Sequence, residues 1–339
     1  MSARIFRLDV TAEYKKAGPD NLIRLLPAPG VNALFLTKQL LEKLAYAIVT
    51  HEFIHLSGPT GSAKSSLLEA LYLNQANFTA LCKALHFPVM PLKVYPIEMA
   101  TYETPGELYQ RRALKDGSTL DEKSRLVDAL EDASANKGSS YPLIWLREIG
   151  RVHSGSVQGG LLNLMTKGDI PLAEGSHLSG QEIAWIADSN YQAENDSVHA
   201  LVVLDDALKR RFGVQLTLSY LAPEEEMQVL RQVLMENEEA GKKKPDDEAI
   251  LKAVHLGNVI RRHRSEGNLQ SVAPPTIWGY LAFLRMSFGL PHLSLPQIAT
   301  STLLGNASAD DQNTVAVVLN EVFGLQEESS GEELSTNLF

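Results

Sequence analysis

A glycine-rich octapeptide, GPTGSAKS at residues 58 to 65, constrains the fold of this chain more than any other stretch. It follows the apolar run HEFIHLS and precedes SSLLEAL, which has the character of a helix. A strand that ends in such a loop and continues into a helix directs backbone N–H groups and the positive helix N-terminus at one anion. The sequence therefore predicts a phosphate-binding loop between a strand and a helix.

The residue types in this loop suit a nucleoside triphosphate. Gly58 and Gly61 tolerate positive φ and close approach of the backbone, while Lys64 offers charge to the β- and γ-phosphates and Ser65 a hydroxyl to Mg²⁺. The candidate nucleotide-binding residues are Gly58, Pro59, Thr60, Gly61, Ser62, Ala63, Lys64 and Ser65. Ala63 stands where the GxxxxGK[ST] pattern has its second glycine. The alternative, a Gly/Ser turn before an ordinary helix, is disfavoured by the strand-like and helix-like flanks.

The composition of the chain limits which partners the protein is expected to bind and in which compartment it is expected to work. The 339 residues allow one large domain and a smaller one. A net charge of −10 argues against a nucleic-acid surface as the main partner. Cys82 is the only cysteine, which excludes an intramolecular disulfide and fits a reducing compartment. The first residues lack a secretory apolar core, and no apolar run is long enough to cross a bilayer. We therefore expect a cytoplasmic protein without a membrane partner.

The order of apolar runs predicts an α/β domain followed by a helical one. Strand-like runs occur at 51–57, 93–100, 142–146, 181–190 and 213–218. Helical or hairpin-like sequence separates them, so we predict a parallel sheet with helices on both faces. Helices are expected over 36–49, over 65–85 with a break near 74–77, and over most of 104–138.

Four segments follow from this pattern. Residues 1–35, with Pro27 and Pro29, are predicted to be an extended N-terminal lead-in. Residues 36–221 form the nucleotide-binding domain, and 222–325 form an all-helical lid domain. The acidic, serine-rich segment 326–339 is predicted to be a mobile tail.

Several motifs in order resemble those of an AAA+ ATPase, and more narrowly of the MoxR branch. They are the phosphate loop, the apolar strand ending in Arg147-Glu148, the strand ending in Asn190, the arginines before Phe212, and YLAPEEEMQVLR opening the helical segment. Members of this branch share the alanine before the loop lysine, a segment like IGRVHSGSVQGGLLNLMTKGDIPL and a DRF-like tripeptide where this chain has RRF. The resemblance spans residues from about 36 to 290.

The resemblance implies a role for each matching residue. Glu148 matches the Walker B glutamate that polarises the attacking water, for which a carboxylate is chemically suited. Asn190 matches sensor 1, and Arg211 the arginine finger that reaches a neighbouring subunit's nucleotide, with Arg210 as the close alternative. Plainer interpretations exist: a solvated charge at a strand end for Glu148, turn chemistry for Asn190, and a solvated helix end for the arginines.

Two departures bear on hydrolysis. Arg147 stands where the resemblance implies the Walker B aspartate, so the motif is degenerate. Two unit charges about 4 Å apart at an effective dielectric near 20 interact by about 4 kcal/mol, so a cation that points at Mg²⁺ is seriously unfavourable. Arg147 can point away, reach a phosphate, or pair with an acidic neighbour and leave Mg²⁺ to Ser65 and water. The sensor 2 arginine is also missing from SVAPPTIWGY; Arg261 and Arg262 are candidate replacements, although a run such as RRHR is usually a solvated face.

The resemblance favours an ATPase that binds ATP and Mg²⁺, assembles into a homo-oligomeric ring, expected to be a hexamer, and remodels a protein partner. In the MoxR branch that partner often carries a von Willebrand factor A domain. The alternative is a nucleotide-binding assembly or switch protein with little or no hydrolysis, which Arg147 favours. A P-loop kinase or small-molecule enzyme is disfavoured, because the lid is predicted to be wholly helical and no substrate-pocket motif is present.

Overall fold

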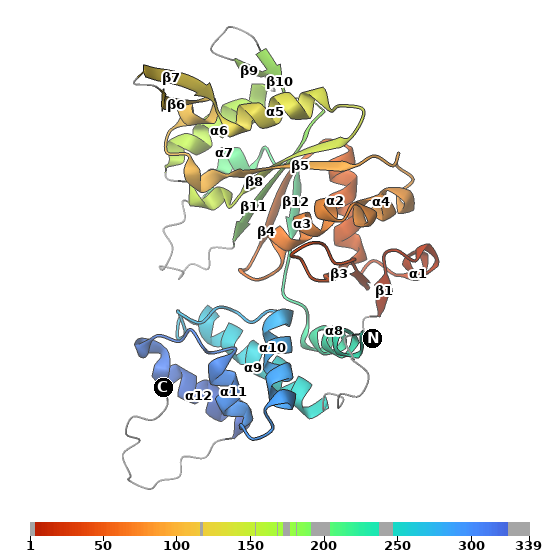
Figure 1. The fold of residues 1–339 in the computed structure, drawn as a ribbon, viewed down its shortest axis with the longest axis vertical. Coiled ribbons are helices and arrows are strands. Elements are labelled where there is room, and N and C mark those ends of the chain that lie inside the picture. Colours follow the sequence, from red (N-terminus) through yellow and green to blue (C-terminus); the bar gives the residue numbers. More distant parts are fainter. Residues whose placement is uncertain are drawn as a thin grey trace. The chain divides into compact units, whose positions relative to one another are not determined.

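The computed structural model describes residues 4–115, 118–152, 154–167, 169–171, 177–180, 182–190, 204–236 and 247–324. The chain divides into two compact units, Met1–Tyr220 and Leu221–Phe339. The first unit is α/β, and the second is helical throughout its described part (Figure 1). The predicted tail 326–339 lies outside the described residues. Within the described ranges, no helix combines the length and the apolar character that crossing a membrane demands.

A five-stranded, all-parallel sheet forms the centre of the first unit. Its spatial order is β12-β4-β11-β8-β5. The strands are β4 (Phe53–Gly58), β5 (Leu92–Glu98), β8 (Tyr141–Arg147), β11 (Ala184–Asn190) and β12 (Val214–Thr217). Each coincides with one of the five predicted runs, so the predicted α/β parallel sheet is confirmed. Because all five strands are parallel, their carboxyl ends meet at one edge, where ligands of open α/β sheets bind.

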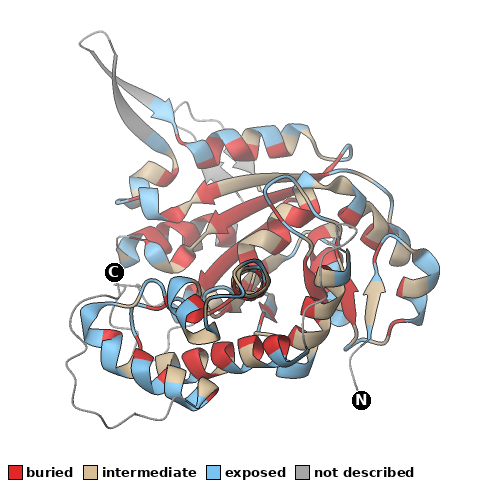
Figure 2. Ribbon diagram, turned by 60° about the horizontal axis from the view of Figure 1, so that its bottom comes forward, coloured by how far each residue is buried: buried red, intermediate tan, exposed pale blue. Residues whose placement is uncertain are grey.

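Both faces of the sheet are buried: β8 and β11 are buried along almost their whole length, and β8 is accordingly almost continuously apolar. One apolar core joins the sheet to α2 (Lys38–Val49), α3 (Lys64–Leu73) and α4 (Gln75–Ala84). The other joins it to α5 (Arg125–Ala135), α6 (Gly155–Lys167) and the short α7 (Asp206–Lys209). Figure 2 shows the buried strands between helices whose outer sides are exposed. The predicted helices on both faces are therefore confirmed.

Local signals set the ends of these helices. Thr37 caps α2, its side chain accepting a hydrogen bond from the Leu40 N–H. Asn74 separates α3 from α4 and caps the second helix in the same way, by accepting from Ala76. The predicted helix over 36–49 and the predicted break near 74–77 are thus both confirmed.

The prediction of an extended lead-in over residues 1–35 is wrong for most of that segment. It contains β1 (Ile5–Arg7), α1 (Thr11–Lys16) and β2 (Leu22–Arg24), which with β3 (Phe35–Thr37) make a separate three-stranded sheet. Leu22, Ile23 and Leu25 are fully buried. Strands of three residues carry too little periodicity to be distinguished from a proline-broken coil.

The prediction of mostly helical structure over 104–138 holds only for its second half. The first half contains the antiparallel hairpin of β6 (Gln110–Lys115) and β7 (Ser118–Lys123). An Asp-Gly dipeptide at 116 and 117 is a typical hairpin-turn sequence and is the signal that could have found it. A second hairpin joins β9 (Asp169–Pro171) to β10 (His177–Ser179), and short 3-10 turns lie at Met99–Thr101, Pro105–Leu108 and Ile149–Arg151.

The second unit contains five α-helices in its described part. They are α8 (Pro223–Glu236), α9 (Asp247–Ser265), α10 (Ile277–Gly289), α11 (Leu295–Ser301) and α12 (Gln312–Phe323), with a 3-10 turn at Ala309–Asp311. Their core holds an ion pair: Arg261 lies 2.7 Å from the almost fully buried Glu226, which also accepts from the Tyr280 hydroxyl at 3.3 Å. Tyr280 packs so closely on Gly257 that a Cβ there would collide with its ring.

We predict that Gly257→Ala destabilises the helical unit by about 1–3 kcal/mol, because the added methyl must displace Tyr280 from its place beside Glu226. Urea unfolding followed by circular dichroism measures the change. Gly289→Ala is the matched control, since a Cβ at that position meets no atom within 4 Å, and we expect it to change stability by less than about 0.5 kcal/mol. Equal stabilities of the two variants would contradict the close helix contact.

Candidate functional site

The phosphate loop begins at Gly58, the last residue of β4, where the backbone is too crowded for a side chain. A Cβ on Gly58 would collide with the carbonyl oxygen of Leu218 and lie 2.9 Å from Ser62 Oγ. The crowding arises because the Leu218 N–H donates to the Ser57 carbonyl at 2.8 Å, extending the β12–β4 pairing past the end of β12. Gly58 is therefore required by close backbone approach, as expected for a phosphate cradle.

Ala63, the odd residue of the motif, has the backbone conformation for which glycine is usually chosen. Its φ and ψ are 67° and 23°, in the left-handed region, immediately before α3 begins at Lys64. A left-handed L-residue costs roughly 1–2 kcal/mol. The backbone at Ala63 therefore has the left-handed conformation that glycine would adopt, although the methyl group of alanine makes this conformation strained.

Lys64 is buried within the loop, with only 6% of its surface exposed. Its Nζ donates to the carbonyl oxygens of Gly58 and Pro59, both at 2.9 Å. Burial lowers the pKa of Lys64, and the negative charges of Asp188 and Glu148 act in the opposite direction. Two carboxyl groups from the ends of other strands therefore stabilise the charged form of Lys64.

The remaining loop residues form the entry to α3. The Ser62 N–H donates to the Pro59 carbonyl at 3.2 Å, which closes the turn. The carbonyl of Thr60 accepts from the hydroxyl of Tyr220 at 2.7 Å, a contact that sequence reasoning missed. Ser65 lies in the first turn of α3, partly exposed, at the positive end of that helix.

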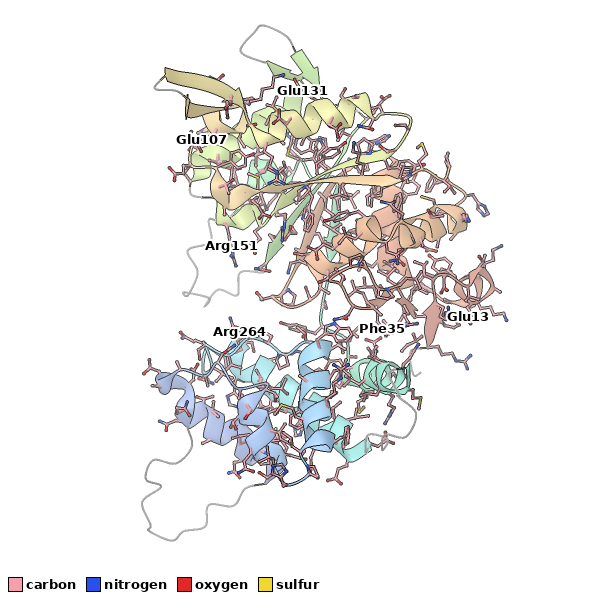
Figure 3. The ribbon with its side chains drawn as sticks, in the orientation of Figure 1. Glu13, Phe35, Glu107, Glu131, Arg151 and Arg264 are labelled. Atoms are coloured by element: carbon pink, nitrogen blue, oxygen red, sulfur yellow. The ribbon has the colours of Figure 1, made fainter. Side chains whose placement is uncertain are left out.

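Glu148 follows β8 directly and has an unusual backbone. Its φ and ψ are 51° and 50°, again left-handed and uncommon for glutamate. Its N–H makes a long hydrogen bond of 3.4 Å to Asp188 Oδ1, and its Oε2 lies 3.0 Å from Arg151; Figure 3 labels Arg151. Both members of this ion pair are more than a third exposed, so it contributes less than about 1 kcal/mol and leaves the carboxylate easy to redirect.

Asn190, the candidate sensor, ends β11 beside the start of the phosphate loop. In the parallel register of β11 and β4 it is the partner of Gly58. Three adjacent segments, the β4 loop, the end of β11 and the end of β8, thus bring Lys64, Asn190 and Glu148 to the same edge of the sheet.

Arg147 pairs with an acidic neighbour, which decides between the alternatives left open by the sequence. Its guanidinium lies 2.5 Å from Glu98 Oε1 on the edge strand β5. It also lies 4.8 Å from the centre of the Trp145 ring. The cation is therefore held toward β5, on the side of β8 opposite to β11 and β4.

Asp188 is the residue of this region that sequence reasoning missed. It lies on β11, is only 3% exposed, and accepts a 2.6 Å hydrogen bond from Trp145 Nε1. Burial raises the pKa of Asp188, while the bonds from Trp145 and Glu148 and the charge of Lys64 oppose the rise. The available signal was a carboxylate directly after the apolar residues AWIA in a predicted strand, because an aspartate in a buried strand is rare unless it is paired.

The two candidate finger arginines follow the short helix α7. Both side chains are exposed, and no hydrogen bond or ion pair joins either to another of the described residues. The next residue, Phe212, is buried, and its ring centre lies 5.5 Å from that of His55 on β4. The sheet thus anchors this segment, while Arg210 and Arg211 face outward.

The candidate replacements for sensor 2 bind within the helical unit. Arg261 donates to Glu226 and, at 2.8 Å, to the Pro275 carbonyl. Arg262 pairs with Glu321 at 2.5 Å. Thr276, in the segment where the resemblance to the MoxR branch predicts an arginine, instead caps α10. The arginines of this run therefore stabilise the packing of α9 with its neighbours.

The residues of the loop fit a nucleoside triphosphate. They provide a side-chain-free cradle at Gly58, a buried ammonium at Lys64 and the N-terminus of a ten-residue helix. Among the described residues, no group of three or more His, Cys, Asp or Glu side chains could hold a metal by itself. A Mg²⁺ ion bound here would therefore depend on phosphate oxygens, water, Ser65 and one or two carboxylates, which is its usual set of ligands beside a nucleotide.

No protein-family model and no curated protein matches the sequence. Among solved structures, the chain is similar to a putative ATPase from Cytophaga hutchinsonii ATCC 33406, with 15% identity and a TM-score of 0.38, over 84% of this chain and 89% of that one. It is also similar to NtrX from Brucella abortus, with 15% identity and a TM-score of 0.44, over 81% of this chain and 54% of that one. Because both TM-scores are low, the chain's own residues must carry any conclusion about function.

We predict that Ala63→Gly leaves the free energy of unfolding unchanged or raises it by up to about 1 kcal/mol, because relief of the left-handed strain offsets the added chain entropy. Chemical denaturation measures this. The matched control is Ala80→Gly inside α4, which is expected to cost about 1 kcal/mol. An Ala63→Gly loss as large as that of the control would mean that the strained conformation is not present.

Proposed function

We propose that this chain is an AAA+ ATPase of the MoxR type that binds ATP with Mg²⁺ at residues 58 to 65 and hydrolyses it. The observation that carries the proposal is the buried Lys64 in a loop whose first residue, Gly58, has no room for a side chain, together with the charges of Asp188 and Glu148 from the ends of two other strands. The parallel sheet and the following helical unit agree with this class of protein.

The residues of the site divide the chemistry among them. Lys64 and the loop N–H groups would bind the β- and γ-phosphates, and the Ser65 hydroxyl would ligate the metal. Bound Mg²⁺ would neutralise charge on these phosphates. Glu148 would orient the attacking water and accept its proton. The Asn190 amide, on the residue that pairs with Gly58 in the strand register, would donate a hydrogen bond to the γ-phosphate or to that water.

The left-handed backbone of Glu148 supports its catalytic assignment. A non-glycine residue in this conformation costs of order 1–3 kcal/mol, and such residues concentrate at functional sites. This conformation lies between the end of β8 and the 3-10 turn Ile149–Arg151, so Glu148 stands at the carboxyl edge of the sheet where the chain leaves the strand.

We further propose that copies of the chain assemble into a ring, in which Arg211 or Arg210 reaches the nucleotide of a neighbouring copy. Their exposure and their lack of partners among the described residues support this role. The resemblance to the MoxR branch makes a hexamer the expected ring and a protein with a von Willebrand factor A domain the expected client.

A second candidate function, a nucleotide-dependent assembly or switch protein with negligible turnover, is favoured by two observations. Arg147 occupies the position of the Walker B aspartate, and both candidate sensor 2 arginines are bound within the helical unit. This candidate shares the ATP-binding loop with the first and differs only in hydrolysis.

We predict slow, Mg²⁺-dependent release of phosphate from ATP by the purified chain. Lys64→Ala should abolish both ATP binding and release. Glu148→Gln should retain binding but lower the rate by about 10²–10⁴-fold, since it removes the base and keeps the shape. Glu131→Gln on α5, a partly exposed residue paired with Lys123, is the matched control and should be unaffected.

The outcomes separate the two candidate functions. If the wild-type rate equals that of Lys64→Ala while ATP still binds to the wild type, the switch function stands and the ATPase does not. If ATP does not bind to the wild type at all, both proposals are wrong.

The finger assignment predicts complementation between two inactive variants. Lys64→Ala cannot bind nucleotide and Arg211→Ala cannot supply the finger, but a mixed ring contains interfaces with both groups intact. Random mixing in equal amounts should restore roughly a quarter of the wild-type rate. Arg210→Ala in place of Arg211→Ala tests the alternative. Mixed rings that form but show no recovery with either arginine variant would contradict a finger in trans.

A further inference from the structure

Three charged residues and one leucine form a single row across the sheet near its carboxyl edge. Strand pairing places Glu98 on β5 beside Arg147 on β8, and Asp188 on β11 beside Leu56 on β4. The β11–β8 register, which pairs Ala187 with Leu146, continues to place Asp188 beside Arg147. The row therefore reads Glu98, Arg147, Asp188, Leu56 from the edge strand toward the strand that carries the phosphate loop.

All members of this row face the side of the sheet that α3 covers. Leu56 belongs to the apolar core that the sheet shares with α2 and α3. So do Trp145, two positions before Arg147 on β8, and Ile186, two positions before Asp188 on β11. Side chains alternate along a strand, so residues two apart share a face. The row thus lies beneath the helix whose first residue is Lys64.

The opposite charges of this row are separated in space. Arg147 is held toward the edge strand by Glu98, at 2.5 Å. The Trp145 side chain lies between, with the Arg147 guanidinium 4.8 Å from its ring centre and its Nε1 donating to Asp188 at 2.6 Å. The negative charge of Asp188 is consequently not neutralised by Arg147. Asp188 lies on β11, the strand next to β4, which carries the loop.

The hydrogen bonds of Asp188 leave one of its oxygens available. Trp145 Nε1 and the Glu148 N–H both donate to Oδ1. Oδ2 receives no hydrogen bond from the part of the chain that the structure describes. Oδ2 is not one of the described buried atoms that lack a partner, so it remains accessible to solvent, while burial of the rest of the side chain makes the negative charge costly. A cation or its water shell on the side of Lys64 would compensate for that cost.

We propose that Asp188 is the carboxylate that binds the hydration shell of the nucleotide's Mg²⁺, in place of the Walker B aspartate whose position Arg147 occupies. The negative charge has moved one strand along the row, about 4.8 Å, toward the phosphate loop. Arg147 is kept from the metal by Glu98 and Trp145. This inference rests on the proposed binding of ATP at residues 58 to 65 and deepens it.

The test is the effect of Mg²⁺ on ATP affinity, measured by isothermal titration calorimetry with ATP in excess Mg²⁺ and in EDTA. The wild type should bind ATP more tightly with Mg²⁺. In Asp188→Asn the Mg²⁺ gain should fall by about tenfold or more, while affinity in EDTA should be unchanged or higher because a negative charge near the triphosphate is removed. A structural role alone would weaken binding in both conditions.

Glu52→Gln is the matched control, because this exposed carboxylate precedes β4 at the opposite edge of the same sheet and should leave the Mg²⁺ gain unaltered. A folded Asp188→Asn with the full wild-type gain would overturn the inference and leave the proposed function standing. Failure of the wild type to bind ATP in either condition would instead overturn the proposed function.

A second measurement uses the wild-type protein, so it holds even if Asp188→Asn does not fold. Because Trp145 donates directly to Asp188, adding Mg²⁺ to the ATP complex should shift its fluorescence. Trp145→Phe should lose the response, and Trp278→Phe, altered in the helical unit, should retain it. A wild type that binds Mg²⁺ and ATP without a Trp145-dependent change would overturn the role of Asp188.

Discussion

Burial of the Lys64 ammonium is the interaction on which the rest of the site depends. An ammonium with 6% exposure needs acceptors, and the loop provides them through the Gly58 and Pro59 carbonyls. The loop that provides these carbonyls needs glycine at position 58, because a Cβ there would collide with the Leu218 carbonyl oxygen. The negative charges of Asp188 and Glu148, from neighbouring strands, oppose the lowering of the Lys64 pKa by burial. Loop shape and strand order are thus coupled through one cation.

Strand order also resolves the conflict that Arg147 creates. A guanidinium beside the proposed Mg²⁺ would be strongly repelled, but β8 has β5 on one side and β11 on the other. Glu98 on β5 draws the cation away, and Trp145 packs against it while holding Asp188. The motif lacks an aspartate at position 147, and charged residues on three strands, Glu98, Arg147 and Asp188, lie side by side in the sheet.

The sequence was sufficient for the features that depend on local pattern. The strand, loop and helix around residues 58 to 65, the five strands and the α3–α4 break at Asn74 all have strong local signals, and each was placed correctly. The very short β1 and β2 and the β6–β7 hairpin were missed, because their signals are weak or lie in a single dipeptide. The partner of Arg147 and the position of Asp188 could not be derived, since both depend on which strands lie side by side.

The contrast between the two arginine groups shows what burial implies for function. Arg261 is committed to Glu226 in the core of the helical unit, and removing either partner would leave a buried charge unpaired. Such a residue is poorly suited to moving with nucleotide state. The side chains of Arg210 and Arg211 are exposed and form no ion pair with another of the described residues. Groups that must sense or reach a phosphate are therefore to be sought at the sheet edge and after α7, where a change of partner exposes no buried charge.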